Sequence, residues 1–414
     1  MKWNESALKM QNEATRKFIG DHRFDDVRQL ALQFHNHSSH QSTNHSTSLS
    51  FIDIPWALTQ IAGRQFAENK IATWFQSDEI VYPQHLALEQ CSSEQTARYK
   101  SRLLSGVSFV DLTGGFGVDF AFISGKFRET YYVEKQQTLC EIATINFKIL
   151  GLTSRRIIHA DATEYLKKMS PVDAIFMDPG RRSNSGKKVF NIEEAEPDVL
   201  KIQDMLLEKS ETALIKLSPM LDISRALKQI KNTAEVHIVS LDNECKELLF
   251  LLKKNFSTEP LITCVNLTGK NHQPEISFLQ SQEKVRQIEY VSEMKQYIYE
   301  PNASLLKAGF FKGLTDLYPI RKFHTDSHLY TSDTFIPDFP GRIFRVEACT
   351  TFNKKALKNF LSETEKTSLS VRNFPLSVAE LRKKIKIKEG GETFLFATTL
   401  ANGKHILLKA KKPD

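Results

Sequence analysis

The sequence lacks several features that would place it in a specialised class of protein. Its five cysteines are scattered, odd in number and never spaced as a CxxC pair. This usage argues against a disulfide framework or a zinc knuckle and favours a reducing compartment. No apolar run approaches the roughly 20 residues that a membrane-spanning helix needs, and the polar N-terminal stretch lacks the apolar core of a secretory signal. We therefore expect a cytoplasmic protein without a membrane segment.

Residues that could bind a metal are present, but they are not arranged as a site. The polar stretch HNHSSHQSTNHSTS contains four histidines, which are His35, His37, His40 and His45. A low-complexity segment of this kind has no scaffold to fix the geometry of metal ligands. We interpret it as a flexible linker and expect no metal.

The chain has an ordinary globular composition but an uneven charge. Its 414 residues, 41% hydrophobic and 25% charged, suggest two to four domains. From Thr331 to the end there are 16 Lys and Arg against 9 Asp and Glu, so the whole net charge of +7 lies in this last fifth. A basic terminal segment is typical of a protein that binds a polyanion, although a solvated lysine-rich surface explains it equally well. No pattern in the sequence indicates an oligomeric state.

The order of expected elements predicts the fold class. Residues 1–85 have helical spacing of apolar residues, and from Val107 onward strands and helices alternate. Such alternation predicts an α/β fold with a parallel sheet covered by helices. The expected strands are 107–112, 130–134, 156–159, 173–177, 213–217, 235–240 and 261–267, with a further helix between the last two.

The stretch VSFVDLTGGFG (107–117) indicates a nucleotide-like ligand. It reads as a buried strand that ends at Asp111 and breaks into a glycine-rich turn, after which a helix begins. Such a turn lets backbone N–H groups approach the ligand. The second strand ends at Glu134, which is placed to bind ribose hydroxyls. An NAD-binding turn requires a small residue where Phe120 stands, so the dehydrogenase alternative is disfavoured.

The segments DLTGGFGVD, YYVE, HADA and DPGRR, in this order, resemble the successive motifs of class I S-adenosylmethionine (SAM) methyltransferases over roughly residues 86–267. VRNFPLS (371–377) and LFATTL (395–400) resemble the THUMP-like domain that closes some bacterial methyltransferases, and residues 299–314 and 327–333 resemble the ferredoxin-like insert that precedes it. The resemblance implies SAM as cofactor and, because THUMP domains bind RNA, an RNA substrate.

We therefore predict a Rossmann-like class I methyltransferase domain with an N-terminal helical region and a small C-terminal α+β THUMP-like module. The predicted division is 1–85 helical region, 86–270 SAM-dependent methyltransferase domain, 271–332 ferredoxin-like connecting segment and 333–414 THUMP-like domain. Within the connecting segment we expect an amphipathic helix over 282–299. The closing module is expected to contain strands at 341–348, 368–372, 392–400 and 405–409 and helices at 354–360 and 377–385.

The resemblance implies a role for each matching residue. The glycine-rich turn wraps the methionine end of SAM, Glu134 binds the ribose, and Asp161 with Ala162 binds the adenine. The turn residues assigned to the cofactor are Asp111, Thr113, Gly114, Gly115, Gly117 and Asp119.

Asp178 and Pro179 match the acid–proline pair that faces the methyl group in amino-group methyltransferases. There the carboxylate accepts a hydrogen bond from an exocyclic amine and aims its lone pair, so that alignment and desolvation do most of the work.

The sequence departs from this pattern directly after Pro179. Gly180 and Arg181 follow where nitrogen-base methyltransferases continue with proline and an aromatic residue, so the base-stacking ring is missing from its usual place. Arg181, which we include among the catalytic candidates, and Arg182 would clamp a phosphate or pair with nearby acids such as Glu193. We expect transfer of a methyl group to an amino nitrogen of an RNA nucleotide. The alternatives are a methyltransferase acting on a protein or small molecule, or a catalytically inactive RNA-binding protein.

Overall fold

The computed structural model describes residues 13–38, 52–181, 192–269, 273–361 and 364–413. The chain forms two compact units, Met1–Ala234 with Phe250–Ser257, and Glu235–Leu249 with Thr258–Asp414. Within the histidine-rich stretch, residues 35–38 belong to helix α3 (Val27–Ser38) and not to the expected linker, and residues 39–48 lie outside the described residues. Within the described residues, no helix is long and apolar enough to cross a membrane.

The N-terminal region is helical, as predicted. Helix α4 begins after Asp53, whose Oδ1 accepts a hydrogen bond from the Trp56 N–H at 3.0 Å, with Pro55 in its first turn. It packs on two preceding helices through Phe18, Leu30 and other buried apolar residues. The helices of this region are α2 (Glu13–Asp21), α3 (Val27–Ser38), α4 (Ile54–Lys70), α5 (Ala72–Phe75), α6 (His85–Gln90) and α7 (Glu94–Ser101).

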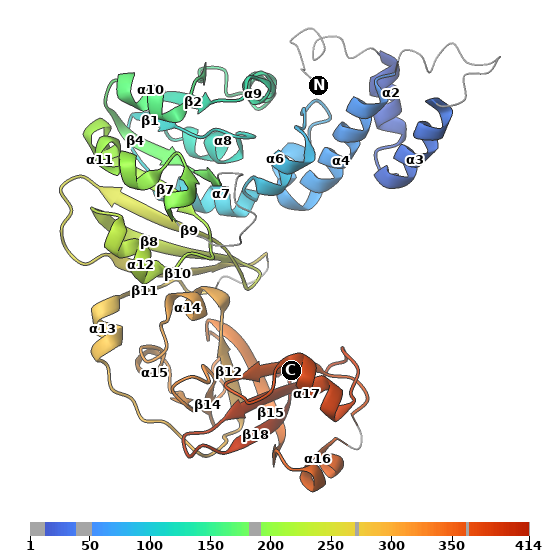
Figure 1. Cartoon of the computed structure of the whole chain (residues 1–414), viewed down its shortest axis with the longest axis vertical. Helices are drawn as coiled ribbons and strands as arrows, with labels where there is room; N and C mark the ends of the chain where they lie inside the picture. The colour runs from blue at the N-terminus through green and yellow to red at the C-terminus, as the bar shows by residue number, and fades with distance from the viewer. Residues whose placement is uncertain (1–12, 39–51, 182–191, 270–272, 362–363, 414) are drawn as a thin grey trace. The chain divides into compact units, whose positions relative to one another are not determined.

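A nine-stranded sheet follows, and it confirms the α/β class (Figure 1). Its strands are β1 (Ser108–Asp111), β2 (Glu129–Glu134), β3 (Arg156–His159), β4 (Val172–Met177), β7 (Ser210–Leu217), β8 (Thr233–Leu241), β9 (Glu244–Lys253), β10 (Leu261–Leu267) and β11 (Ile276–Leu279). The order is β11-β10-β8-β9-β7-β4-β1-β2-β3. Strands β3, β2, β1, β4 and β7 pair in parallel. The connecting helices are α8 (Val118–Ser124), α9 (Gln137–Ile149), α10 (Ala162–Lys168), α11 (Val199–Lys209) and α12 (Ile223–Gln229).

The chain order of the strands reverses around β1. From β1 the chain proceeds to β2 and β3 on one side and then crosses to β4 on the other. In open α/β sheets the ligand binds beyond the carboxyl ends of the strands at such a reversal. The carboxyl ends of β1 and β4, at Asp111 and Met177, therefore mark the expected site.

The helix expected between the strands at 235–240 and 261–267 is wrong, because residues 244–253 form strand β9. The apolar run of this segment fits either structure, and periodicity alone does not separate a short buried helix from a buried strand. Asp242 and Asn243 decide it. Both adopt left-handed backbone conformations, with φ of 49° and 65°, which is the geometry of a tight two-residue hairpin turn.

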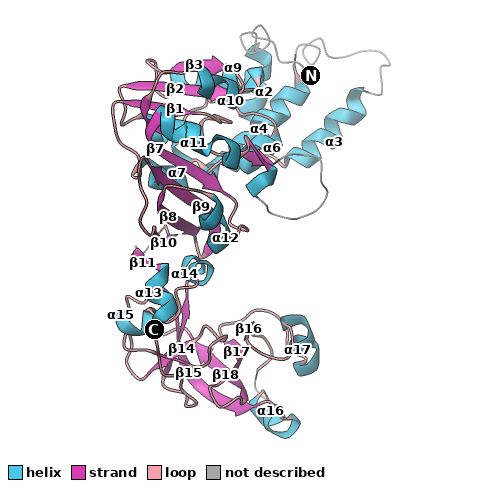
Figure 2. Cartoon of the chain, turned by 60° about the vertical axis from the view of Figure 1, so that its left-hand side comes forward, coloured by secondary structure: helices cyan, strands magenta, loops and turns pink. Residues whose placement is uncertain are grey.

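The C-terminal part forms a seven-stranded sheet (Figure 2). Its strands are β12 (Tyr297–Pro301), β13 (Arg321–Lys322), β14 (Tyr330–Ser332), β15 (Gly341–Thr351), β16 (Ser368–Arg372), β17 (Phe394–Thr399) and β18 (His405–Lys411), in the order β13-β14-β12-β15-β18-β17-β16. Helices α14 (Ala303–Ala308), α15 (Leu314–Leu317), α16 (Lys354–Phe360) and α17 (Val378–Ile385) accompany it. The strands and helices predicted from residue 341 onward are confirmed, to within three residues at each end.

The amphipathic helix expected over 282–299 is also wrong. Only α13 (Gln280–Val285) is helical, and β12 begins at Tyr297. Val285 is 76% exposed, whereas Val291 and Met294 pack from a non-helical segment against a core that contains Ile298. The helical spacing of these residues is therefore overridden by packing against the C-terminal sheet.

Candidate active site

The turn after β1 is hydrogen-bonded to the ends of both neighbouring strands. Thr113 donates its N–H to Asp111 Oδ1 at 3.0 Å, and its Oγ1 accepts the Asp178 N–H at 2.6 Å. On the other side, Gly115 donates its N–H to Glu134 Oε2 at 2.9 Å. Five of the predicted site residues thus lie together at the carboxyl ends of β1, β2 and β4.

The glycines of this turn are required by close packing and by backbone conformation. A Cβ at Gly114 would lie 2.1 Å from Cε2 of Tyr132, a fully buried ring on β2. Gly115 and Gly117 have φ of +57° and +89°, in the left-handed region that favours glycine. The Tyr132 hydroxyl donates to the Gly115 carbonyl, and Gly117 caps α8. The turn therefore lies directly on Tyr132, and its shape is set by that side chain.

Asp111 is the most unusual carboxyl group of the site. It is 1% exposed, and its Oδ2 has no hydrogen-bond partner within the described residues. Burial raises its pKa well above the ordinary value, the Thr113 N–H opposes this, and the carboxylates of Asp119, Asp178 and Glu134 raise the pKa further. An acceptor oxygen that is buried without a partner is suited to a ligand that brings a cation or an N–H donor.

Glu134 ends β2, and Asp161 follows the end of β3 by two residues. Glu134 is 7% exposed, and its Oε1 accepts the Gln136 N–H at 2.8 Å, so both of its oxygens are held by backbone donors. Asp161 is exposed and caps α10, accepting the N–H groups of Thr163 and Glu164 at 2.9 and 3.1 Å. Ala162 follows as a buried residue at 8% exposure. Their ribose and adenine roles stay predictions.

The carboxylate of Asp119 faces helix α7. Its Oδ2 accepts the Ser92 hydroxyl at 2.7 Å, and its Oδ1 lies 3.1 Å from Nζ of Lys100, whose side chain is fully buried. Helix α7 begins after Ser93, because Ser93 Oγ accepts the Thr96 N–H. Asp119 thus joins α7 to α8, and its role in cofactor binding stays a prediction.

Asp178 is paired with a lysine that sequence reasoning did not place in the site. Its Oδ2 lies 2.5 Å from Nζ of Lys216, at the end of β7. The side chains of Asp178 and Lys216 are 35% and 13% exposed. A detectable signal was present, since Lys216 interrupts the apolar run TALIKL at a strand end.

The segment after Pro179 begins a small hairpin. Gly180 and Arg181 form β5 and pair with β6 (Ala195–Glu196). Arg182 lies outside the described residues, so a phosphate clamp of these two arginines stays a prediction. Glu193, expected as an alternative partner for them, accepts a hydrogen bond from Gln229 and lies 3.7 Å from Arg225.

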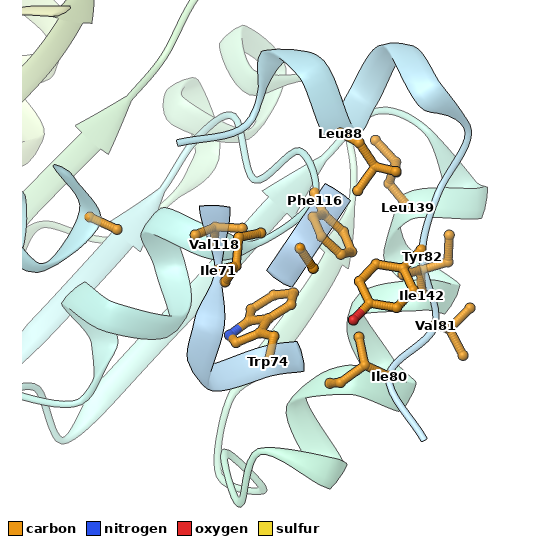
Figure 3. Packing of buried hydrophobic residues seen from close by; sticks show 12 residues of the cluster. Ile71, Trp74, Ile80, Val81, Tyr82, Leu88, Phe116, Val118, Leu139 and Ile142 are labelled. Atoms are coloured by element: carbon orange, nitrogen blue, oxygen red, sulfur yellow. The ribbon is translucent and has the colours of Figure 1, made fainter. Parts of the chain in front are cut away.

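Residues of the N-terminal region pack against the glycine-rich turn. The ring of Phe116 lies edge-on to Trp74, with centroids 4.9 Å apart, and close to Tyr82, as Figure 3 shows. The backbone of Val81 is held at both polar atoms by the buried Asn146 side chain of α9, at 2.8 and 2.9 Å. The helical region therefore supports the turn through Phe116, a role that the sequence analysis left unassigned.

Metal ligands and disulfides contribute nothing to this arrangement within the described residues. There, no three His, Cys, Asp or Glu side chains gather as a group that would hold a metal ion. All five cysteines are free.

Comparisons with known proteins identify relatives of the whole chain and of its C-terminal part. Residues 297–340 match a model of a ferredoxin-like domain, and residues 341–412 match a model described as THUMP domain-like. A crystal structure of a "putative methyltransferase" from Porphyromonas gingivalis W83 is 31% identical, with a TM-score of 0.85 and 100% of each chain covered. Uncharacterized S-adenosylmethionine-dependent methyltransferases from two Mycobacterium tuberculosis strains are 19% identical over 364 residues, which is 84% of this chain and 94% of theirs. The chain belongs to the family of class I SAM-dependent methyltransferases that carry a C-terminal THUMP-like domain.

Proposed function

We propose that this SAM-dependent methyltransferase acts on RNA and methylates an exocyclic amino nitrogen of a nucleotide. The observation that carries the proposal is the position of Asp178. Its carboxylate follows β4, next to the turn assigned to the cofactor, and is partly exposed. One oxygen is occupied by Lys216, while Oδ1 has no partner within the described residues. An oriented acceptor oxygen at this place is what an amino group requires.

The residues at the strand ends fit SAM as the cofactor. When bound, SAM supplies a methyl group on a positively charged sulfonium. The buried Asp111 Oδ2, which has no hydrogen-bond partner within the described residues, fits the ammonium group of the methionine part of SAM. Gly115 and Gly117 allow the backbone of the turn to come close to the carboxylate of the same methionine part. Glu134 would hold the ribose hydroxyls.

The chain's own residues then align the acceptor. Asp178 Oδ1 accepts one N–H of the amino group, and the Lys216 ammonium, bound to Oδ2, fixes the direction of the carboxylate. With SAM bound, its methyl group would pass from the sulfonium sulfur to the nitrogen, leaving S-adenosylhomocysteine, and Asp178 Oδ1 would take the one proton that the nitrogen loses. Alignment supplies most of the rate because displacement at a sulfonium needs little covalent help.

The C-terminal module supports RNA as the substrate class. Its basic excess accompanies the THUMP-like match, and four lysines in the last turn of α17 and just after it are exposed. They are Lys383, Lys384, Lys386 and Lys388. Replacing the first three with Gln is expected to flatten the dependence of RNA affinity on salt. Each phosphate contact that is lost lowers the number of counterions released when RNA binds. An unchanged slope would place the RNA elsewhere on the chain.

The test of the function uses methyl-labelled SAM. Total RNA and total protein from a strain lacking the gene are incubated with the full-length enzyme in parallel. We expect label in material that nuclease destroys and protease does not. Label in protein, or in neither fraction while SAM still binds, would replace the proposal with one of the alternatives: protein or small-molecule methylation, or RNA binding without turnover.

A variant pair tests the assignment of Asp178. Asp178→Ala is expected to retain the rise in melting temperature that SAM causes but to lose methyl transfer. Asp204→Ala is the matched control, since Asp204 is a 71% exposed acid on α11. Full turnover by Asp178→Ala would show that the acceptor binds elsewhere.

A further inference from the structure

Three charged side chains meet at one end of the C-terminal sheet. Glu300 lies on β12 and is paired in register with Arg342 on β15. Arg372 ends β16, which is separated from β12 by β15, β18 and β17 in the sheet order, yet it contacts the same glutamate. The sheet must therefore curl until its distant strands approach. Two further bonds across the gap agree, between Ser327 and Thr399 and between His324 and Asn373.

The charges of this cluster do not cancel. Glu300 is only 2% exposed, so its carboxylate must be paired. Its Oε2 accepts from Nε and a terminal nitrogen of Arg342, and its Oε1 accepts from Arg372 at 2.8 Å. One carboxylate neutralises one guanidinium, and the second arginine leaves an excess of one positive charge at a fixed place.

Both guanidinium groups have N–H donors that form no hydrogen bond within the described part of the chain. A guanidinium has five N–H donors. Arg342 uses two on Glu300, and Arg372 uses one on Glu300 and one on the Val371 carbonyl. Three donors on each arginine are thus without a partner within the described part of the chain. The side chains are 40% and 35% exposed, so solvent and ligands reach them.

The cluster is held rigidly before any ligand arrives. Arg342 lies within a long strand, and Arg372 ends a strand and is followed by Asn373 in a left-handed conformation with φ of 53°. The Asn373 carbonyl accepts the Thr399 hydroxyl, and its side chain bonds to His324 at 2.9 Å. Glu300 therefore acts as a buried anchor that fixes the direction of two planar donor forks. Fixed forks lose little entropy when they bind an anion.

We propose that Arg342 and Arg372, oriented by Glu300, form a binding site for the backbone phosphate of RNA. The free N–H donors of two guanidinium groups held beside one carboxylate can bind the oxygens of a phosphodiester, and planar guanidinium groups do so better than lysines would. The identity of the partner rests on the proposed RNA substrate, while the anion site itself rests on the cluster. Glu300 lies in the ferredoxin-like segment, and both arginines lie in the THUMP-like segment. The site therefore forms only when the strands of the two segments are joined in one sheet.

The test compares charge-matched variants of the full-length protein. The probe is a fluorescein-labelled, mixed-sequence, single-stranded RNA of about 20 nucleotides, long enough to carry many phosphates. The variant replaces Glu300, Arg342 and Arg372 together with Gln, so that no buried charge is left unpaired. The matched control is Arg345→Gln, an exposed arginine on the same strand whose side chain points to the opposite face.

We expect the triple variant to bind the probe on the order of tenfold more weakly, with a salt slope lower by about 0.7 per lost phosphate contact. The Arg345→Gln control is expected to change less in both measures. Equal affinity and equal slope for the triple variant and the wild type, with circular dichroism confirming the fold, would overturn the proposal.

Competition experiments at constant ionic strength test whether the site prefers the phosphates of an RNA backbone to other anions. Unlabelled RNA is expected to displace the probe, whereas inorganic phosphate and poly-glutamate at equal charge are not. Displacement by phosphate or poly-glutamate as effective as that by RNA would overturn the assignment to an RNA backbone. If RNA is methylated while the variants bind normally, only this inference fails. If RNA is never methylated but the triple variant loses binding, the proposed function fails and the phosphate site stands.

Discussion

The ion pair between Asp178 and Lys216 yields the sharpest prediction about catalysis. Lys216→Ala removes the cation that fixes the carboxylate 2.5 Å away. Coulomb's law at an effective dielectric constant of about 20 gives two unit charges at this distance an attraction of roughly 6–7 kcal/mol. Asp178 is 35% exposed, so solvent screens much of this attraction, and we expect a coupling free energy of about 1–3 kcal/mol in the transition state.

The assay is a double-mutant cycle on the rate of methyl transfer. Lys216→Ala is expected to lower kcat about 10- to 100-fold, while the stabilisation of the protein by SAM remains unchanged. Asp178→Asn is expected to abolish most of the activity. Adding Lys216→Ala to it is then expected to have little further effect, since the interaction is already lost. The exposed pair Asp204 and Lys231, 3.9 Å apart, is the control cycle, with coupling near zero. Effects of the two active-site variants that add within about 0.5 kcal/mol would refute the idea that Lys216 acts through Asp178.

Three further predictions concern stability. Gly114→Ala forces a Cβ against the buried Tyr132 ring and is expected to lower the free energy of unfolding by about 1–3 kcal/mol and to abolish the SAM-induced rise in melting temperature; an unaffected SAM response would contradict the tight turn. Asp119→Asn removes the charge facing the buried Lys100 and is expected to cost about 3–5 kcal/mol in urea unfolding, with partial recovery when Lys100→Met is added. Burial lowers the pKa of His328 to about 4, so stability is expected to fall as pH drops from about 6.5 toward 4, and His328→Asn should weaken that fall; parallel pH curves would refute it.

The sequence sufficed where pattern and local chemistry agree. The alternation of strands and helices, the turn at Gly114–Gly117 and the strand ends at Asp111 and Glu134 follow from apolar period and from glycine and acid positions. Residues 244–253 were misassigned because a continuous apolar run has no period that separates helix from strand. The feature that identifies a hairpin in place of a helix is the pair Asp242 and Asn243, both of which adopt a left-handed backbone conformation.

What the sequence does not reveal are partners that are distant along the chain. Lys216 and Asp178 are 38 residues apart and meet only because β4 and β7 are neighbours in the sheet. Likewise, nothing in the sequence distinguishes Tyr132 from other strand residues, although its ring leaves no space for a side chain at Gly114. The expected helix over 282–299 fails for the same reason, because the surface that covers Val291 and Met294 is built by later strands.

The sheet that joins β12 to β15 sets where this protein can be divided. The boundary between the two matched family segments, at residues 340 and 341, falls between two strands that pair along five residues. A fragment ending there would leave the edge of β12 open, and open edges pair with other chains. The segments matched by the two family models are therefore not separate units of folding. Expression of residues 297–340 or of residues 341–412 alone is expected to yield aggregates, whereas a fragment that starts before β12 and includes both segments is not.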